Sequence, residues 1–274
     1  FAFSGCTGLT SVAIGSGVTN IGSSVFYNCS GIRDVTLNAN LPSFKASSVF
    51  SNSYQSWTNL VIGTSVTNID STAFYNCTKL TYITVDASNL FYRDIEGVLF
   101  SKNLSVLIVY PAGRTGDYSI PNGVTSIGSY AFSGCTGLTS VTIGNSVASI
   151  GSYAFSGCSK LTSVTIPDSV TGIGSSAFSG CTGLTSVTIG SGVINISSSA
   201  FSGCYNIRDV TFNANLPSFK ASSVFSSSYQ SWTNLVIGTS VTNIGDSAFY
   251  GCTGLTSVTI GNGVTSIGSQ VFRT

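Results

Sequence analysis

The sequence predicts a repeat solenoid, a stack of short coils in which every coil buries its apolar side against the next. Cysteine recurs every 23 residues, at Cys6 and Cys29 and again at Cys135, Cys158, Cys181 and Cys204. The residues between these cysteines repeat the pattern C-x-x-L-x-x-V-x-I-x-x-x-V-x-x-I-G-x-x-A-F. A fixed period of roughly 20 to 50 residues is typical of solenoids. With roughly 24 residues per coil, the 274 residues predict about eleven coils and a long surface without an obvious pocket.

Each coil is expected to contain one short β-strand. The V-x-I segment, as in Val141 and Ile143, alternates β-branched residues with Thr, and Gly, Asn or Ser follows it. Alternation with period two that ends in turn residues predicts a strand, and stacked coils make such strands parallel neighbours. A second apolar pair, such as Val147 and Ile150, is expected on the return side of the coil. The phenylalanines of the A-F motif are expected to stack in the interior, at Phe132, Phe155, Phe178 and Phe201.

Two coils depart from the pattern, residues 37–62 and 212–237, and we call them the variant coils. Each of the two 48-residue gaps between successive cysteines holds two coils, one of which is a variant coil. Each carries a tryptophan where the other coils carry the leucine, so core packing is favoured over ligand stacking for Trp57 and Trp232. The variant coils lie 175 residues apart, which indicates that a unit of about seven coils has been duplicated.

The 58-residue gap between Cys77 and Cys135 contains an insertion at about residues 94–118. Two apolar β runs flank Ser101-Lys102-Asn103, which predicts a hairpin. We interpret residues 1–274 as a single solenoid that carries this hairpin-like insertion. The chain contains no Met and starts in mid-repeat, so we expect the natural array to be longer.

Composition excludes two classes of partner. Only 7% of the residues are charged, and ten Lys and Arg are offset by nine Asp and Glu for a net charge of +1. Because these charges are spread singly, no basic patch for nucleic acid is predicted. No apolar run approaches the roughly 18 to 20 residues of a membrane helix. We therefore expect neither nucleic-acid binding nor direct membrane insertion.

The pattern A-F-S-G-C-T-G-L-T-S-V-T-I, followed by P or G and then V-T-x-I-G, resembles the BspA-like (treponemal-type) leucine-rich repeats of bacterial and protist surface proteins. The resemblance covers essentially the whole chain. The insertion resembles a variant coil of that family, in which Glu96-Gly-Val-Leu-Phe100 precedes Tyr110-Pro-Ala-Gly113 and Tyr118-Ser-Ile-Pro121. The resemblance implies a right-handed leucine-rich-repeat superhelix, with irregular or short-helical return segments, on a secreted or surface-anchored protein. Several members of that family are adhesins for host matrix proteins or other cells. The resemblance implies no catalytic residues in this sequence.

The cysteines are expected to form a line along the stack, because they occur once per coil at the same position. Stacked strands lie roughly 4.8 Å apart, which is within disulfide range, but the side chains of stacked coils point in parallel. A zinc site needs thiolates that converge on one point. We therefore expect buried, reduced thiols that pack as small hydrophobes and bind no metal. This structural role is assigned to Cys6, Cys29, Cys77, Cys135, Cys158, Cys181, Cys204 and Cys252.

Catalysis is not expected. The sequence contains no His, which removes Ser-His and Cys-His nucleophile pairs and imidazole metal ligands. Asp94, Glu96 and Asp117 could converge at the insertion, but such a cluster beside a hairpin is more often a solvated turn. We predict a protein that is not an enzyme and needs no cofactor.

Two non-enzymatic functions remain. The outward residues of the strands are mostly Ser and Thr, and the candidate anchors that replace them are Arg33, Asp34, Tyr82, Arg208 and Asp209. Arg and Tyr are favoured hot-spot residues, so we predict an extracellular or cell-surface adhesion module that binds a protein or glycan on a host or neighbouring cell through the strand face. The alternative is a structural stalk or filament without a specific ligand, in which the Arg-Asp pairs merely accompany the variant coils.

The ends of the array are expected to lack caps. Phe1-Ala-Phe3 and Val271-Phe272 are repeat fragments that leave apolar edges open. Such edges predict fraying or end-to-end self-association.

Overall fold

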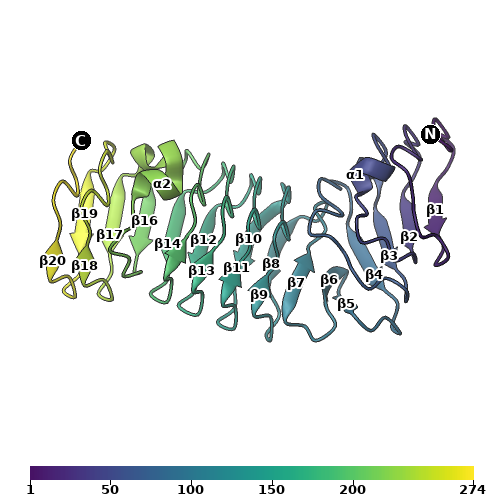
Figure 1. Ribbon diagram of the computed structural model, residues 1–274. Coiled ribbons are helices and arrows are strands. Elements are labelled where there is room, and N and C mark those ends of the chain that lie inside the picture. Colours follow the sequence, from purple (N-terminus) through teal and green to yellow (C-terminus); the bar gives the residue numbers. More distant parts are fainter. The chain divides into compact units, whose positions relative to one another are not determined.

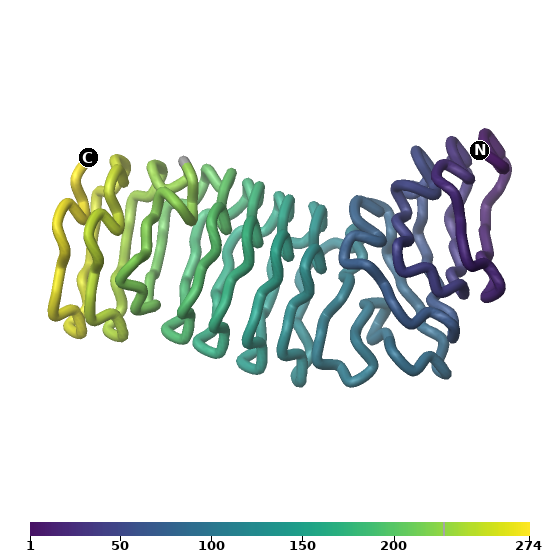
Figure 2. Tube along the Cα trace, viewed as in Figure 1, coloured from purple at the N-terminus to yellow at the C-terminus, as the bar shows by residue number. Residues whose placement is uncertain are grey.

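The computed structural model describes residues 1–226 and 228–274, and it confirms the predicted fold. The chain forms two compact units, Phe1–Thr115 with Gly128–Gly137 and Gly116–Ile127 with Leu138–Thr274. Each unit is a β-solenoid, and together they comprise about eleven coils of mostly parallel strands with little helix. Figure 2 traces the coils, from the N-terminus in purple to the C-terminus in yellow.

The strand face of each unit is built from the predicted V-x-I segments (Figure 1). The first unit has a four-stranded parallel sheet in the order β1 (Ser11–Ile14), β2 (Asp34–Leu37), β3 (Asn59–Ile62) and β4 (Tyr82–Val85). In the second unit β8 (Gly116–Ser119) pairs with β10 (Leu138–Thr142). A five-stranded parallel sheet contains β12 (Ser163–Ile166), β14 (Ser186–Ile189), β16 (Asp209–Phe212), β17 (Asn234–Ile237) and β19 (Ser257–Ile260).

Like residues lie opposite one another in these sheets. Val187, for example, is in register with Val164 on one side and Val210 on the other, and all three are buried. The Ser and Thr between the apolar residues face outward, as the alternation predicts. The strand face is therefore an apolar layer inside and a hydroxyl-rich layer outside.

The return side carries very short strands. In the second unit these are β9 (Ser126–Ile127), β11 (Ser149–Ile150), β13 (Gly172–Ile173) and β15 (Asn195–Ile196), followed by a separate pair of β18 (Asn243–Ile244) and β20 (Ser266–Ile267). Val147 and Ile150 are buried there, as expected for the second apolar pair. The break between β15 and β18 falls at a variant coil, which contributes no strand to the return side.

The variant coils contain the helical segments. In the first unit these are α1 (Ala46–Val49) and the 3₁₀ turn η1 (Tyr54–Ser56), and in the second they are α2 (Ala221–Phe225) and η2 (Ser226–Ser231). Trp57 and Trp232 follow these turns and are fully buried. Each indole ring makes a T-shaped contact with a phenylalanine, Phe50 at 4.6 Å and Phe225 at 4.7 Å.

Phenylalanine rings form the core. Phe155, Phe178 and Phe201 are fully buried and stack face to face, with 4.9 Å between successive ring centroids. In the first unit the buried ring of Phe132 stacks on Tyr110 at 4.9 Å. The interior position predicted for these rings is therefore found in both units.

The insertion is a three-stranded antiparallel meander of β5 (Tyr92–Ile95), β6 (Val98–Ser101) and β7 (Val106–Val109). The predicted hairpin between β6 and β7 is present. A second, unpredicted hairpin joins β5 to β6 through the two residues Glu96 and Gly97, whose φ angles are 51° and 80°. Two positive φ angles in a two-residue loop are the mark of a type I′ turn, which matches the twist of paired strands.

Threonine hydroxyls fasten successive coils. The Oγ1 of Thr185 donates to the backbone carbonyl of Thr162 at 3.1 Å, and that of Thr256 donates to Thr233 at 3.0 Å. The same bond joins Thr81 to Thr58 in the first unit. These contacts are uncharged and repeat the 23-residue spacing of the coils.

Among the described residues no helix is both long and apolar enough to cross a lipid bilayer.

Candidate binding surfaces

A polar row crosses the strand face of the first unit. Asp34 of β2 lies in register with Asn59 of β3, and Asn59 lies in register with Tyr82 of β4. The side-chain amide of Asn59 donates to Asp34 Oδ1 at 2.7 Å. Two of the predicted anchors, Asp34 and Tyr82, therefore belong to one row, and Asn59 between them was not predicted.

The second unit has an equivalent row that lacks the tyrosine. Asp209 lies in register with Asn234, whose amide donates to Asp209 Oδ1 at 3.3 Å. The next position in the row is Ser257. The Arg208-Asp209 pair belongs to this unit and the Arg33-Asp34 pair to the other, so the structure presents two separate sets of anchors.

The side chains of the two arginines form hydrogen bonds to backbone carbonyls. Arg33 Nη1 donates to the carbonyls of Ser30 and Ile32 at 2.9 and 3.0 Å. Arg208 Nη1 donates at 3.0 to 3.2 Å to Tyr205, Ile207 and Ser231. Each guanidinium therefore fastens the turn before its strand, which is a structural role that sequence reasoning did not assign.

Tyr82 stands at the border between the strand face and the insertion. Its side chain is 46% exposed, and its ring lies against Gly97, where an added Cβ would come within 2.6 Å of a ring carbon. A side chain at position 97 would therefore displace the ring. Glycine is doubly required there, because its φ of 80° also disfavours L-residues.

The acidic residues of the insertion do not gather into one site. Asp94 Oδ1 accepts the backbone N–H of Val85 at 2.8 Å, and Asp117 Oδ1 accepts the hydroxyl of Thr139 at 2.6 Å. The carbonyl of Glu96 accepts from Arg114 at 2.8 Å. Across residues 1–226 and 228–274 no group of three or more His, Cys, Asp and Glu side chains could hold a metal ion.

The cysteines are all unbonded, and seven of them are buried. Cys181 Sγ donates to the carbonyl of Phe155 at 3.0 Å, and Cys204 Sγ donates to Phe178 at 3.1 Å. Burial raises the pKa of the Cys77 and Cys181 thiols well above their ordinary value, and it raises the pKa of Cys252 to about 12. These thiols are therefore neutral at physiological pH and are poor nucleophiles.

Cys6 differs from the other cysteines because it is exposed. In later coils the thiol contacts the coil before it, as Cys29 Sγ does when it donates to the carbonyl of Phe3 at 2.9 Å, whereas Cys6 lies in the first coil. Position in the stack, and not residue type, decides the burial of this thiol.

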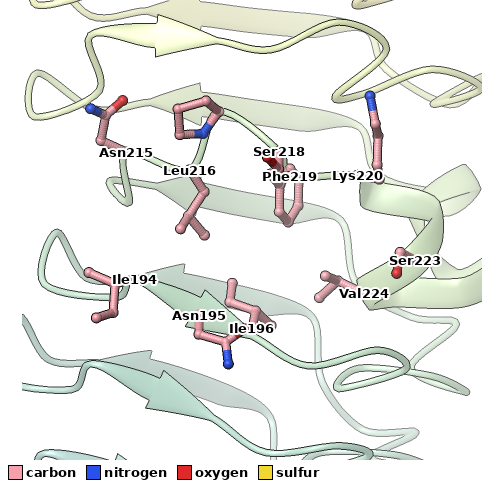
Figure 3. A pocket seen from close by; sticks show the side chains of 11 residues that line it. Ile194, Asn195, Ile196, Asn215, Leu216, Ser218, Phe219, Lys220, Ser223 and Val224 are labelled. Carbon is pink, nitrogen blue, oxygen red and sulfur yellow. The ribbon is translucent and has the colours of Figure 1, made fainter.

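The expectation of a surface without pockets was wrong. A groove of about 370 Å³ opens on the return side of the second unit, between β15 and the variant coil (Figure 3). We call it the second-unit groove. It is lined by Ile194, Asn195, Ile196, Asn215, Leu216, Pro217, Ser218, Phe219, Lys220, Ser223 and Val224.

The same groove recurs in the first unit, shifted by 175 residues and smaller, at about 190 Å³. This first-unit groove is lined by Thr19, Asn20, Ile21, Leu41, Pro42, Ser43, Phe44, Lys45, Ser48 and Val49. Between the two linings, the exchange of Thr19 for Ile194 is the one difference in residue type at positions that line both grooves.

A proline interrupts the ladder of backbone hydrogen bonds and opens the groove. In the preceding coils Thr171 N donates to Ala148 O at 2.8 Å, and Ile194 N donates to Thr171 O at 3.0 Å. The variant coil places Pro217 at the next step, and proline has no N–H to donate. In the part of the chain that the structure describes, the carbonyls of Ile194 and Ile196 accept no hydrogen bond.

On the other side of the variant coil, an asparagine side chain accepts hydrogen bonds from the backbone N–H groups of the next coil. Asn215 Oδ1 accepts the backbone N–H groups of Thr242 and Asn243 at 3.2 and 3.3 Å. In the first unit Asn40 Oδ1 accepts those of Thr67 and Asn68 at 3.1 and 3.3 Å. On this edge a side chain therefore replaces the missing backbone acceptor in both units.

The interior of the second-unit groove is apolar and its rim is polar. Figure 3 shows Leu216 and Phe219 pointing from the variant coil toward Ile196 on the other wall. Lys220 points away, and its ammonium donates to the backbone carbonyl of Asp246. The only charged side chain of the lining is therefore directed out of the groove.

Comparisons with known proteins agree with the fold. The model of the BspA type leucine rich repeat region matches in six copies, over residues 1–107, 114–230 and 221–274. No curated protein matches the chain.

Solved structures of bacterial proteins share the fold. The pneumococcal vaccine antigen PcpA superposes with a TM-score of 0.68 at 22% identity, over 84% of this chain and 56% of that one. A leucine rich cell surface protein from Faecalibacterium prausnitzii A2-165 gives a TM-score of 0.60 at 30% identity, over 94% and 62%. A leucine-rich repeat protein from Eubacterium ventriosum gives 0.56 at 22% identity, over 97% and 82%.

The match to PcpA spans 56% of that chain and the match to the Faecalibacterium protein 62% of that one, so this chain corresponds to part of each. The family model, in contrast, covers nearly every coil described above, from the V-x-I strands to the variant coils. The chain therefore belongs to the BspA-type leucine-rich-repeat family.

Proposed function

We propose that this chain is an extracellular or cell-surface adhesion module that binds a protein or glycan on a host or neighbouring cell through its strand face. The observation that carries the proposal is the row of Asp34, Asn59 and Tyr82 on neighbouring strands of the first unit. It combines an acceptor, an amide and a half-exposed aromatic ring on an otherwise hydroxyl-rich surface. Tyrosine at such a position is a favoured interface anchor.

The row is held in place before any partner arrives. Asp34 and Asn59 are joined by a hydrogen bond of 2.7 Å, and the ring of Tyr82 rests on the hairpin at Gly97. Preorganised side chains lose little conformational entropy on binding, which favours affinity. The repeat family and the cell-surface neighbour support a role outside the cell.

A structural stalk is the second candidate, and the arginines favour it. Arg33 and Arg208 both donate hydrogen bonds to backbone carbonyls of the preceding turn. Their recurrence before each variant coil is then explained by folding alone. The two candidates differ in one measurable property, because a stalk has no saturable ligand.

The test compares adhesion of variants to immobilised matrix proteins and to cell-surface glycans. In one variant Arg33, Asp34, Tyr82, Arg208 and Asp209 are all replaced by Ser or Thr, and in a second only Tyr82→Ser is made. A control replaces the exposed Lys79 and Lys160 with Ser. Circular dichroism confirms that each variant is folded.

We expect saturable binding by the parent chain and by the lysine control, and a loss of about tenfold or more in the five-residue variant. Tyr82→Ser alone should show a large part of that loss. Saturable adhesion that is unchanged in the five-residue variant would move the contact away from the strand face. Absence of saturable adhesion to both surfaces would favour the stalk.

A further inference from the structure

We propose that the second-unit groove binds a neutral saccharide, and that the first-unit groove is a smaller copy of the same site. The groove lies on the return side, away from the strand face of the proposed adhesion surface. The inference therefore goes beyond that function and stands or falls separately from it.

The size of the groove fits a small ligand. Its volume of about 370 Å³ lies within the range of roughly 300 to 1,000 Å³ that small-molecule sites occupy. The first-unit groove, at about 190 Å³, is below that range. Saccharide binding is therefore expected to be stronger in the second unit.

The open backbone carbonyls define what the ligand must supply. Ile194 and Ile196 present oxygens that the regular ladder would have paired with N–H groups of the next coil. A carbonyl oxygen without a partner in the protein is open to a donor, so a ligand that donates hydrogen bonds to both oxygens matches this wall of the groove. Saccharide hydroxyls are such donors, and they also accept from the hydroxyls of Ser218 and Ser223 on the lining.

The remaining lining selects for a ligand without charge. Lys220 is the one charged residue of the lining, and its ammonium is engaged with the carbonyl of Asp246 outside the groove. Burying an ionised group against Leu216 and Phe219 would lose its hydration without a compensating partner. A sugar ring avoids this loss, because its C–H face packs on apolar side chains while its hydroxyls reach the rim.

An extended peptide fits less well than a saccharide. On the strand face β14, β16 and β17 pair directly, so each coil advances by one strand spacing of roughly 4.8 Å. The coils of β15 and β18 are therefore two spacings apart, and the variant coil already fills the position between them. A peptide that paired as an added strand would need one more strand spacing between β15 and β18, whereas a sugar ring needs only the space of the groove.

The duplicated segment retains the features that make the groove. Residues 32–70 and 207–245 differ at three aligned positions, which are 37/212, 52/227 and 70/245. The preceding residues 1–31 and 176–206 differ at nine. The asparagine, the proline and the lysine of the groove are the same in both copies, at Asn40, Pro42 and Lys45 and at Asn215, Pro217 and Lys220.

The experiment measures sugar binding by the full chain. Cellobiose, maltose, lactose and chitobiose are titrated by calorimetry and by saturation-transfer NMR, with sialyllactose as the charged comparison. Ile194→Trp fills the second-unit groove from an exposed position, and Ser218→Trp does so from the other wall. Thr171→Trp is the matched control, because Thr171 occupies the position of Ile194 one coil earlier, where the ladder is closed.

We expect at least one neutral disaccharide to bind, with an affinity that falls about tenfold or more in Ile194→Trp and in Ser218→Trp and is unchanged in Thr171→Trp. Tyr82→Ser should leave sugar binding intact, which separates this result from the strand-face test. Failure of all four disaccharides to bind would overturn the proposal. Equal binding by the parent and both groove variants, or binding of sialyllactose alone, would overturn it as well.

Discussion

Phe178→Leu should destabilise the second unit more than its burial alone explains. Phe178 is fully buried and stacks in parallel between Phe155 and Phe201, with 4.9 Å between centroids on each side. An aromatic pair contributes about 0.5 to 1.5 kcal/mol beyond the area it buries. Two pairs therefore add about 1 to 3 kcal/mol to the loss that any buried Phe→Leu exchange produces.

Phe100→Leu is the matched control for that substitution. Phe100 is also fully buried, but no ring contact of Phe100 is found among the described residues. The difference between the two variants isolates the stack, because loss of hydrophobic transfer is common to both. We expect Phe178→Leu to be more destabilising by about 1 to 3 kcal/mol.

Native-state hydrogen exchange is the appropriate assay, because repeat arrays do not unfold in one cooperative step. The amides of Phe155 and Phe178 donate to the carbonyls of Ala177 and Ala200 at 2.6 and 2.7 Å, so they report the opening of these coils. For the control variant the amides of β6 are followed. An equal loss of opening free energy at the two sites would refute the role assigned to the stacked rings.

Three further predictions concern the thiols, the insertion and acid pH. Alkylation at pH 8 followed by mass spectrometry should label Cys6 quickly and the seven buried cysteines only after denaturation, and rapid labelling of all eight in the native protein would contradict the burial of the thiols. Asn89→Ala should destabilise the insertion by about 3 kcal/mol or more, because the buried Asn89 side chain accepts from the Phe91 and Tyr92 amides and donates to the carbonyls of Gly63 and Val66. Hydrogen exchange of the Phe91 and Tyr92 amides should become faster in this variant, whereas Asn103→Ala, in an exposed turn, should leave both amides protected. Hydrogen bonds from the Ser191 backbone and side chain lower the pKa of Asp168 below its ordinary value of 3.8. The hydrogen bond from the Ser191 amide to the Asp168 carboxylate should therefore be fully formed above pH 3.8 and be lost as the pH falls through the lowered pKa. An NMR titration of Asp168 with a midpoint at or above 3.8 would contradict this.

The repeated coils could be predicted because each structural feature recurs in the sequence. The V-x-I strands, the buried Val147 and Ile150 and the stacked phenylalanines follow from alternation and period alone. The hairpin at Glu96 and Gly97 was missed because glutamate rarely adopts a positive φ, so the pair does not look like a turn. Its geometry is imposed by the paired strands on either side.

The candidate sites were less predictable, because they depend on contacts between coils. Arg33 and Arg208 were identified as outward residues, but their hydrogen bonds to the preceding backbone become visible only when the turn is folded. The grooves depend on one missing N–H at Pro42 and Pro217. A single proline in the sequence indicates a break in a ladder, but the width of the gap that follows depends on how the neighbouring coils pack.

The threonine bonds between coils bear on how such a protein changes over generations. Each bond runs from a hydroxyl to the backbone carbonyl of the coil before, so it requires nothing of the partner's side chain. A coil copied or deleted by recombination meets the same acceptor wherever it is inserted. Selection can therefore alter the number of coils without redesigning the junctions between them, and side chains on the surface are free to diverge while the array keeps its fold.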